Sequence, residues 1–206
     1  MKEIEGKLSA KGLKVALVAS RFNSFLVEQL VKGAADAFNR LGGDAAGLVL
    51  VRVPGAYEIP VTAKGLRIAL VASRFNSFLV EQLVKGAADA FARLGGDDKN
   101  LTLVRVPGAY EIPVTAKRLA ATKAYDAVVG LGAVVQGATP HASLITETTA
   151  RAFAEIALET GVPVTDGVVS AENLEQAVER CGTKQGNKGF AAMQAAIELA
   201  NVLKQI

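Results

Sequence analysis

The chain has 206 residues, half of them hydrophobic, and a formal net charge of +3 at pH 7. The charge is mild and no block of five like charges occurs, so neither nucleic acid nor a membrane surface is indicated as a partner. No apolar run approaches the roughly 18–20 residues of a membrane span, and the polar N-terminus has no secretory core. The single cysteine, Cys181, allows no internal disulfide, so we expect a cytoplasmic protein.

A long internal repeat organises the first half of the chain. Residues 12–64, called copy one, return as residues 65–117, called copy two, and 46 of the 53 aligned pairs are identical. Removing one copy of 53 residues leaves 153 residues, a common size for a single domain. We therefore predict an N-terminal segment (1–11), a duplicated βαβ unit (12–64) and one domain (65–206) that includes copy two.

Copy one reads as a strand over 13–19, a helix and a second strand over 48–53. Only residues 54–65 separate it from the first strand of copy two. A parallel crossover needs a dozen or more residues, so an ordinary helical crossover between the copies is not expected. Copy one can instead extend a sheet edge, exchange into a neighbouring chain or form a separate flap, and the sequence leaves these three open.

Copy two and the rest of the chain alternate short apolar runs with helical patterns. The predicted strands cover 66–72, 101–106, 127–132 and 162–169, and the predicted helices cover 78–94, 112–121, 144–160, 171–181 and 190–205. This alternation predicts an α/β fold, a three-layer α/β/α sandwich with a flavodoxin-like parallel sheet. In such sheets, ligands bind beyond the carboxyl ends of the strands.

The segment Gln136–His141 follows the third of these strands. Its Gly137-Ala138-Thr139 turn can offer backbone N–H groups and a hydroxyl to an anion. His141 is the only histidine of the chain and is suited to acid–base chemistry near neutral pH. The alternative is that His141 is an incidental histidine in a loop. Its place at the carboxyl edge of the sheet favours the functional interpretation.

Two further motifs lie at the same edge. The segment 180–189 carries Arg180 and Lys188 among three glycines, which suits phosphate, although a solvated basic loop has the same composition. The turn 107–111 carries Tyr110, which can stack on a flat ring, and Glu111, which can accept hydrogen bonds. Its alternative interpretation is a plain strand-to-helix turn with a favourable N-terminal Glu. Phe75 and Phe22 are phenylalanines, and a phenylalanine side chain lies more often in the core than against a ligand.

Together these residues provide an aromatic platform, one imidazole and a cationic phosphate site. The sequence shows no metal-ligand cluster, no Ser-His-Asp arrangement and no dinucleotide-binding glycine fingerprint. The combination suits condensation of a flat heterocycle with a small phosphorylated compound.

The motifs EGKL, SRFN, VPGAYEIP, GATPH, LEQAVER and GTKQGNKG, in this order, resemble the lumazine synthase family of riboflavin biosynthesis. The resemblance covers residues 1–11 and 65–206. It implies a reaction between 5-amino-6-(D-ribitylamino)uracil and 3,4-dihydroxy-2-butanone 4-phosphate that needs no cofactor. It also implies small-molecule substrates and self-association into pentamers, which in some members build an icosahedral cage. A monomeric flavodoxin-like flavin binder leaves GTKQGNKG without a role.

The resemblance also implies roles for individual residues. Phe75 would stack on the pyrimidine, and the ring and ribityl pocket would be lined by Ala109, Tyr110 and Glu111. Phosphate would be bound by Gly137, Ala138 and Thr139, and His141 would move protons. The neighbouring subunit would contribute Arg180 and Lys188. The counterparts in copy one are Phe22, Ala56, Tyr57 and Glu58.

Two departures from the family pattern bear on activity. Asp166 stands where the family usually has an aromatic that closes the pyrimidine pocket, and Ala142-Ser143-Leu144 replaces a segment that commonly carries two aromatics and an Asp. With the near-exact repeat, these changes suggest an engineered chain. The alternative function is therefore a catalytically impaired scaffold that assembles into an oligomer or cage of altered geometry, and catalytic activity stays open at this point.

Overall fold

The computed structural model describes residues 9–20, 23–53, 62–137, 141–182 and 186–206. The chain divides into two compact units, residues 1–59 and 60–206. In the described residues the strands form two sheets, one of two strands in the first unit and one of four strands in the second. Strand β2 and strand β3 thus belong to different sheets, in agreement with the short connection between the two copies.

The smaller unit is one βαβ element. Strand β1 (Val15–Ser20) pairs in parallel with β2 (Leu48–Val53), and α1 (Ser24–Arg40) connects them. Before β2 lies a short 3₁₀ turn, Ala45–Gly47, which is capped by Asp44. The Asp44 carboxylate accepts a hydrogen bond from the backbone N–H of Ala46 at 3.0 Å. The sequence pattern predicted all three elements of this unit.

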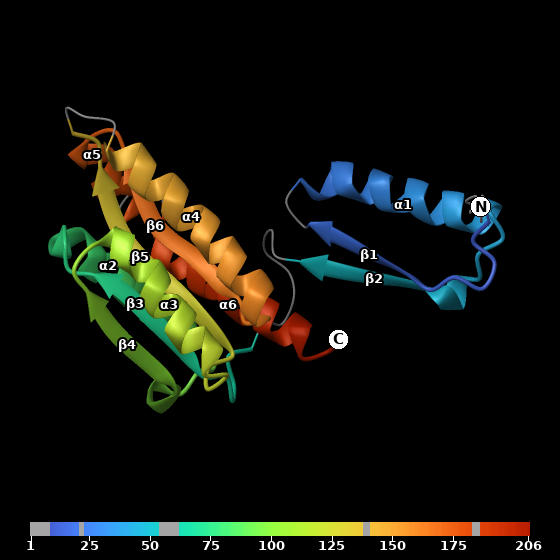
Figure 1. The fold of residues 1–206 in the computed structure, drawn as a ribbon, viewed down its shortest axis with the longest axis horizontal. Coiled ribbons are helices and arrows are strands. Elements are labelled where there is room, and N and C mark those ends of the chain that lie inside the picture. Colours follow the sequence, from blue (N-terminus) through green and yellow to red (C-terminus); the bar gives the residue numbers. More distant parts are fainter. Residues whose placement is uncertain (1–8, 21–22, 54–61, 138–140, 183–185) are drawn as a thin grey trace, which may run out of the picture. The chain divides into compact units, whose positions relative to one another are not determined.

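The larger unit holds a parallel sheet in the order β4-β3-β5-β6. Its strands and helices alternate along the chain (Figure 1). They are β3 (Ile68–Ser73), α2 (Ser77–Arg93), β4 (Leu101–Val106), α3 (Ile112–Ala121), β5 (Ala127–Val135), α4 (His141–Thr160), β6 (Val164–Ala171), α5 (Leu174–Arg180) and α6 (Lys188–Leu203).

Helices cover both faces of this sheet, with α2, α5 and α6 on one face and α3 and α4 on the other. In β3, Ile68 and Leu70 join the core under α2 and α6, whereas Ala69 and Val71 join the core under α3 and α4. A strand buried on both faces reads as a continuous apolar run, which is why periodicity identified it. The three-layer flavodoxin-like fold predicted from the sequence is confirmed.

Most element boundaries differ from the prediction by one to three residues, and three of these differences lie near the candidate site. Strand β5 continues to Val135, and α4 begins at His141 rather than at residue 144. Helix α5 begins at Leu174 rather than at 171, because β6 runs to Ala171 and Asn173 then caps the helix by accepting from the backbone N–H of Gln176 at 2.9 Å.

Candidate functional site

The candidate site lies where the strand order of the larger sheet reverses. The chain crosses from β3 to β4 in one direction and from β5 to β6 in the other. The strand order therefore reverses between β3 and β5, and a crevice opens at their carboxyl ends. A pocket of about 440 Å³, called the switch-point pocket, occupies this place. It is lined by Phe75, Gly108, Ala109, Tyr110, Glu111, Ala133, Val134, Val135, Gly137, His141, Ala142 and Ile145.

The turn after β3 presents Phe75 to this pocket. The backbone N–H of Phe75 donates to the Pro107 carbonyl at 3.1 Å, which ties the turn to the end of β4. Asn76 adopts a left-handed backbone conformation with a φ of 55°. Its side-chain amide donates a hydrogen bond to the Ala133 carbonyl of β5 at 2.9 Å. The Phe75 ring is 69% exposed. It is therefore available to a ligand rather than buried in the core.

The turn after β4 supplies the pocket's carboxylate and its second aromatic ring. Residues Ala109–Glu111 form a 3₁₀ turn that leads into α3, with Ala109 buried and Tyr110 mostly exposed. A Cβ on Gly108 would stand 2.9 Å from Glu111 Oε2, so the carboxylate lies directly over the backbone at Gly108. Glycine at this position leaves Glu111 room to face the pocket.

The opposite wall comes from β5 and the start of α4. The end of β5 gives the apolar surface of Ala133–Val135, and α4 gives Ala142 and Ile145. His141 is the first residue of α4 and lies at the pocket with Gly137. The predicted phosphate ligands Ala138 and Thr139 fall outside the described residues. The described lining thus combines one imidazole, one carboxylate, one phenol and apolar walls.

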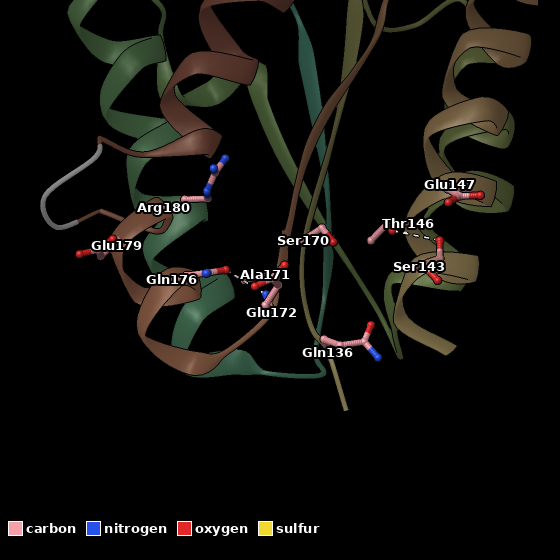
Figure 2. A pocket seen from close by; sticks show the side chains of 10 residues that line it. All are labelled: Gln136, Ser143, Thr146, Glu147, Ser170, Ala171, Glu172, Gln176, Glu179 and Arg180. Atoms are coloured by element: carbon pink, nitrogen blue, oxygen red, sulfur yellow. Dashed lines mark hydrogen bonds between the residues drawn. The ribbon is translucent and has the colours of Figure 1, made fainter. Parts of the chain in front are cut away.

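Arg180 lines a different hollow, shown in Figure 2, of about 810 Å³. Its walls come from the ends of β5 and β6, from α4 and from α5. They consist of Gln136, Ser143, Thr146, Glu147, Ser170, Ala171, Glu172, Gln176, Glu179 and Arg180. Within one chain, Arg180 is therefore separate from the switch-point pocket, and Ser143 faces this hollow too.

Lys188, at the start of α6, is held by β6 of its own chain. Its Nζ lies 3.3 Å from Asp166 Oδ2 and also donates to the Val168 carbonyl. Asp166 Oδ1 accepts from the backbone N–H of Val168 at 2.8 Å, which orients the carboxylate. The acidic residue that departs from the family pattern is thus the ionic partner of Lys188.

Sequence reasoning identified the polar lining but missed the apolar wall and the anchor at Asn76. The wall had a signal, because the apolar run of β5 continues beyond residue 132 to Val135. Asn76 had a weaker one, since Asn tolerates left-handed backbone better than most residues. In the part of the chain that the structure describes, no helix is long and apolar enough to cross a membrane, and no group of three metal-ligating side chains occurs.

The fold and pocket define a three-layer α/β protein with a candidate ligand pocket at the topological switch point. Two comparisons with known proteins specify it further. The family model of 6,7-dimethyl-8-ribityllumazine synthase matches residues 12–66 and, separately, residues 65–204. A protein named 6,7-dimethyl-8-ribityllumazine synthase from Aquifex aeolicus (strain VF5) is 50% identical over 150 residues, which cover 73% of this chain and 97% of the relative. The chain belongs to the lumazine synthase family.

Proposed function

We propose that this chain is an active lumazine synthase. It condenses 5-amino-6-(D-ribitylamino)uracil with 3,4-dihydroxy-2-butanone 4-phosphate. The 5-amino group adds to the ketone and water leaves, phosphate is then eliminated, and the ribitylamino nitrogen closes the ring with loss of a second water. The steps require proton transfers and an anion site, and they require no redox cofactor. The comparisons do not favour the alternative of an inactive scaffold.

The observation that carries this proposal is the gathering of His141, Glu111 and two aromatic side chains in one pocket at the switch point. Phe75 offers an exposed ring against which the flat pyrimidine can stack. Glu111 can accept hydrogen bonds from ring or ribityl donors, with Ala109 and Tyr110 as the adjoining wall. These contacts would hold the amine of one substrate against the ketone of the other.

His141 is the proposed proton carrier. An imidazole at the start of α4 can take a proton from the attacking amine and return one to a leaving group. Gly137, Ala138 and Thr139 precede it and are the proposed phosphate ligands, since a helix N-terminus favours an anion.

A neighbouring subunit completes the site in this proposal. Arg180 and Lys188 are not among the residues that line the switch-point pocket of their own chain, and this supports a role for them from another copy. Self-association into a pentamer-based oligomer would supply them. The single cysteine, which allows no internal disulfide, supports a cytoplasmic location.

The test is formation of lumazine fluorescence from both substrates, measured against the spontaneous reaction. We expect a rate above background, and we expect His141→Ala to lower it about 100-fold or more, in the range of general acid–base catalysis. His141→Gln, which keeps polarity without the basic ring, should lose about as much. A chain that folds but gives no rate above background contradicts the proposal.

A further inference from the structure

Copy one exposes apolar side chains whose counterparts in copy two are buried. Leu30 of α1 is 72% exposed, whereas Leu83 at the same position of α2 is fully buried. Val18 of β1 is 68% exposed, whereas Val71 of β3 is fully buried. The two positions face opposite sides of the sheet in copy two, because Leu83 and Val71 belong to different core clusters. Both faces of copy one are therefore left uncovered within its unit.

The larger unit shows what covers such a surface. Strand β3 pairs with β5 along the edge that faces away from β4, and α2 packs against α6. Val71 lies in the core that α3 and α4 complete. These covering elements come from residues 107–206, of which residues 118–206 are present once and α3 alone begins within copy two.

Copy one has the same local shape as copy two. The β1–β2 register, from Val15 opposite Leu48, repeats the β3–β4 register, from Ile68 opposite Leu101. The ion pair between helix and second strand is also repeated: Glu28 with Arg52 at 2.5 Å corresponds to Glu81 with Arg105 at 2.7 Å. A surface that is complementary to copy two is therefore complementary to copy one as well.

The seven sequence differences between the copies do not prevent copy one from taking the place of copy two. Of the seven pairs that differ, only Val15 and Ile68 occupy a position that is in the buried core of the larger unit. The change removes one methylene group, the mildest of core truncations. The other six differences fall on positions that are exposed or half-buried in copy two.

We propose that copy one is able to dock onto residues 107–206 of a second copy of this chain, in place of residues 65–106 of that chain. Identical elements exchange readily between chains. In the oligomer of the proposed function, on which this choice of a second chain rests, that chain is held close by. Copy two holds the position in the unsubstituted chain because its tether gives it a high effective concentration. The exchange takes over when copy two is weakened.

The first experiment removes the docking ability of each copy in turn. Leu83→Asp places a charge in the core position of copy two, and Leu30→Asp makes the same change at the exposed position of copy one. Hydrogen exchange with mass spectrometry separates the copies, because peptides that span residue 39 or 92 differ in mass. The full chain is used throughout, at several concentrations.

We expect Leu83→Asp to keep amide protection in residues 107–206 and to transfer protection from copy two to copy one. Leu30→Asp should keep the unsubstituted pattern. The double variant should lose protection in both copies and in residues 107–206. If Leu83→Asp alone loses protection as completely as the double variant, copy one does not dock and the proposal is overturned.

A second experiment identifies the chain on which copy one docks. Ile68 and Ala127 are paired on neighbouring strands and face the same core, so Val15→Cys and Ala127→Cys would be neighbours after exchange. Both changes are made in Leu83→Asp with Cys181→Ala, and oxidation is followed by denaturing, non-reducing electrophoresis. Ile68→Cys with Ala127→Cys and Cys181→Ala, in an otherwise unchanged chain, is the control for a bond within one chain.

We expect covalent dimers in the Leu83→Asp background, in increasing yield at higher protein concentration, and cross-linked monomers in the control. Cross-linked monomers in both would place copy one on its own chain and overturn the second-copy assignment. Absence of any bond in the Leu83→Asp background, with the control cross-linked, would overturn the docking itself.

Discussion

Copy one and copy two share their local structure but differ in what surrounds them. Helices α1 and α2 each have 17 residues, and each is followed by a 3₁₀ turn capped by an Asp. The Asp44 and Asp97 carboxylates each accept a backbone hydrogen bond at 3.0 Å. Phe38 and Phe91 both pack closely over a glycine in the turn after their helix. These features depend on residues near in sequence.

Burial follows the surroundings instead. Leu26 is 53% exposed and its counterpart Leu79 is 2% exposed, although the flanking sequence is the same. The difference arises from β5 and α6, which pack against α2 in the larger unit. A βαβ unit therefore specifies its own backbone, whereas its core is completed only by elements that are distant in sequence.

The largest expected effect contrasts the same truncation in the two copies. Leu83→Ala should destabilise the chain by about 2–5 kcal/mol because it opens a cavity in the core. Leu30→Ala removes an exposed side chain and should change the stability by about 0.5 kcal/mol or less. Denaturant unfolding at low protein concentration, where exchange between chains is disfavoured, measures both. Equal losses would show that copy one is as buried as copy two.

A second pair of substitutions should have opposite signs. A Cβ on Gly86 would stand 2.3 Å from the side chain of Asn187, which caps α6 and donates to the Gln82 carbonyl at 2.7 Å. Gly86→Ala should therefore destabilise the chain by about 1–3 kcal/mol. At Gly33 nothing lies within 4 Å, so Gly33→Ala should stabilise α1 by up to about 1 kcal/mol. Thermal unfolding of both variants tests the contrast, and effects of one sign would contradict it.

The third prediction concerns the site. Tyr110→Ala should lower kcat/KM for lumazine formation about 2- to 10-fold, the loss expected for one aromatic contact. Tyr57→Ala is the matched substitution in copy one, and it should leave the rate unchanged because the pocket is lined by the turn of copy two. A comparable loss from Tyr57→Ala would mean that copy one also supplies a working turn.

The smallest effect concerns Cys181, which belongs to the core that copy two completes. Burial raises the pKa of its thiol to about 11 from an ordinary value of 9.0. Because the folded state favours the protonated thiol, this contribution is present below pH 9 and is lost as the pH rises towards 11. The unsubstituted chain should lose more stability over that interval than Cys181→Ala. Parallel pH profiles for the two chains would contradict this assignment.

Sequence patterns located elements best where their ends carry strong signals. Strand β4 and helix α3 were predicted to the residue, because Pro107-Gly108 ends one and the next apolar pattern begins the other. Helix α5 was predicted to begin too early, since the capping role of Asn173 was not considered.

The site was predictable in its polar residues and not in its assembly. Phe75, Glu111 and His141 could be assigned to one edge because parallel strands end together. That Asp166 pairs with Lys188 depends on the register between β6 and the start of α6, which no local pattern contains. Nor could sequence separate exposed Leu30 from buried Leu83, because their local sequences are the same.

The ion pair between Asp166 and Lys188 changes how an anion would be bound at this end of the sheet. A phosphate group that approaches Lys188 meets a cation that already has a carboxylate partner and a backbone acceptor. Phosphate would then replace the carboxylate as the ionic partner of Lys188. The free energy of binding would be the difference between the lysine–phosphate and the lysine–carboxylate interactions. In the proposed reaction, such a competition would favour ready release of inorganic phosphate over tight retention.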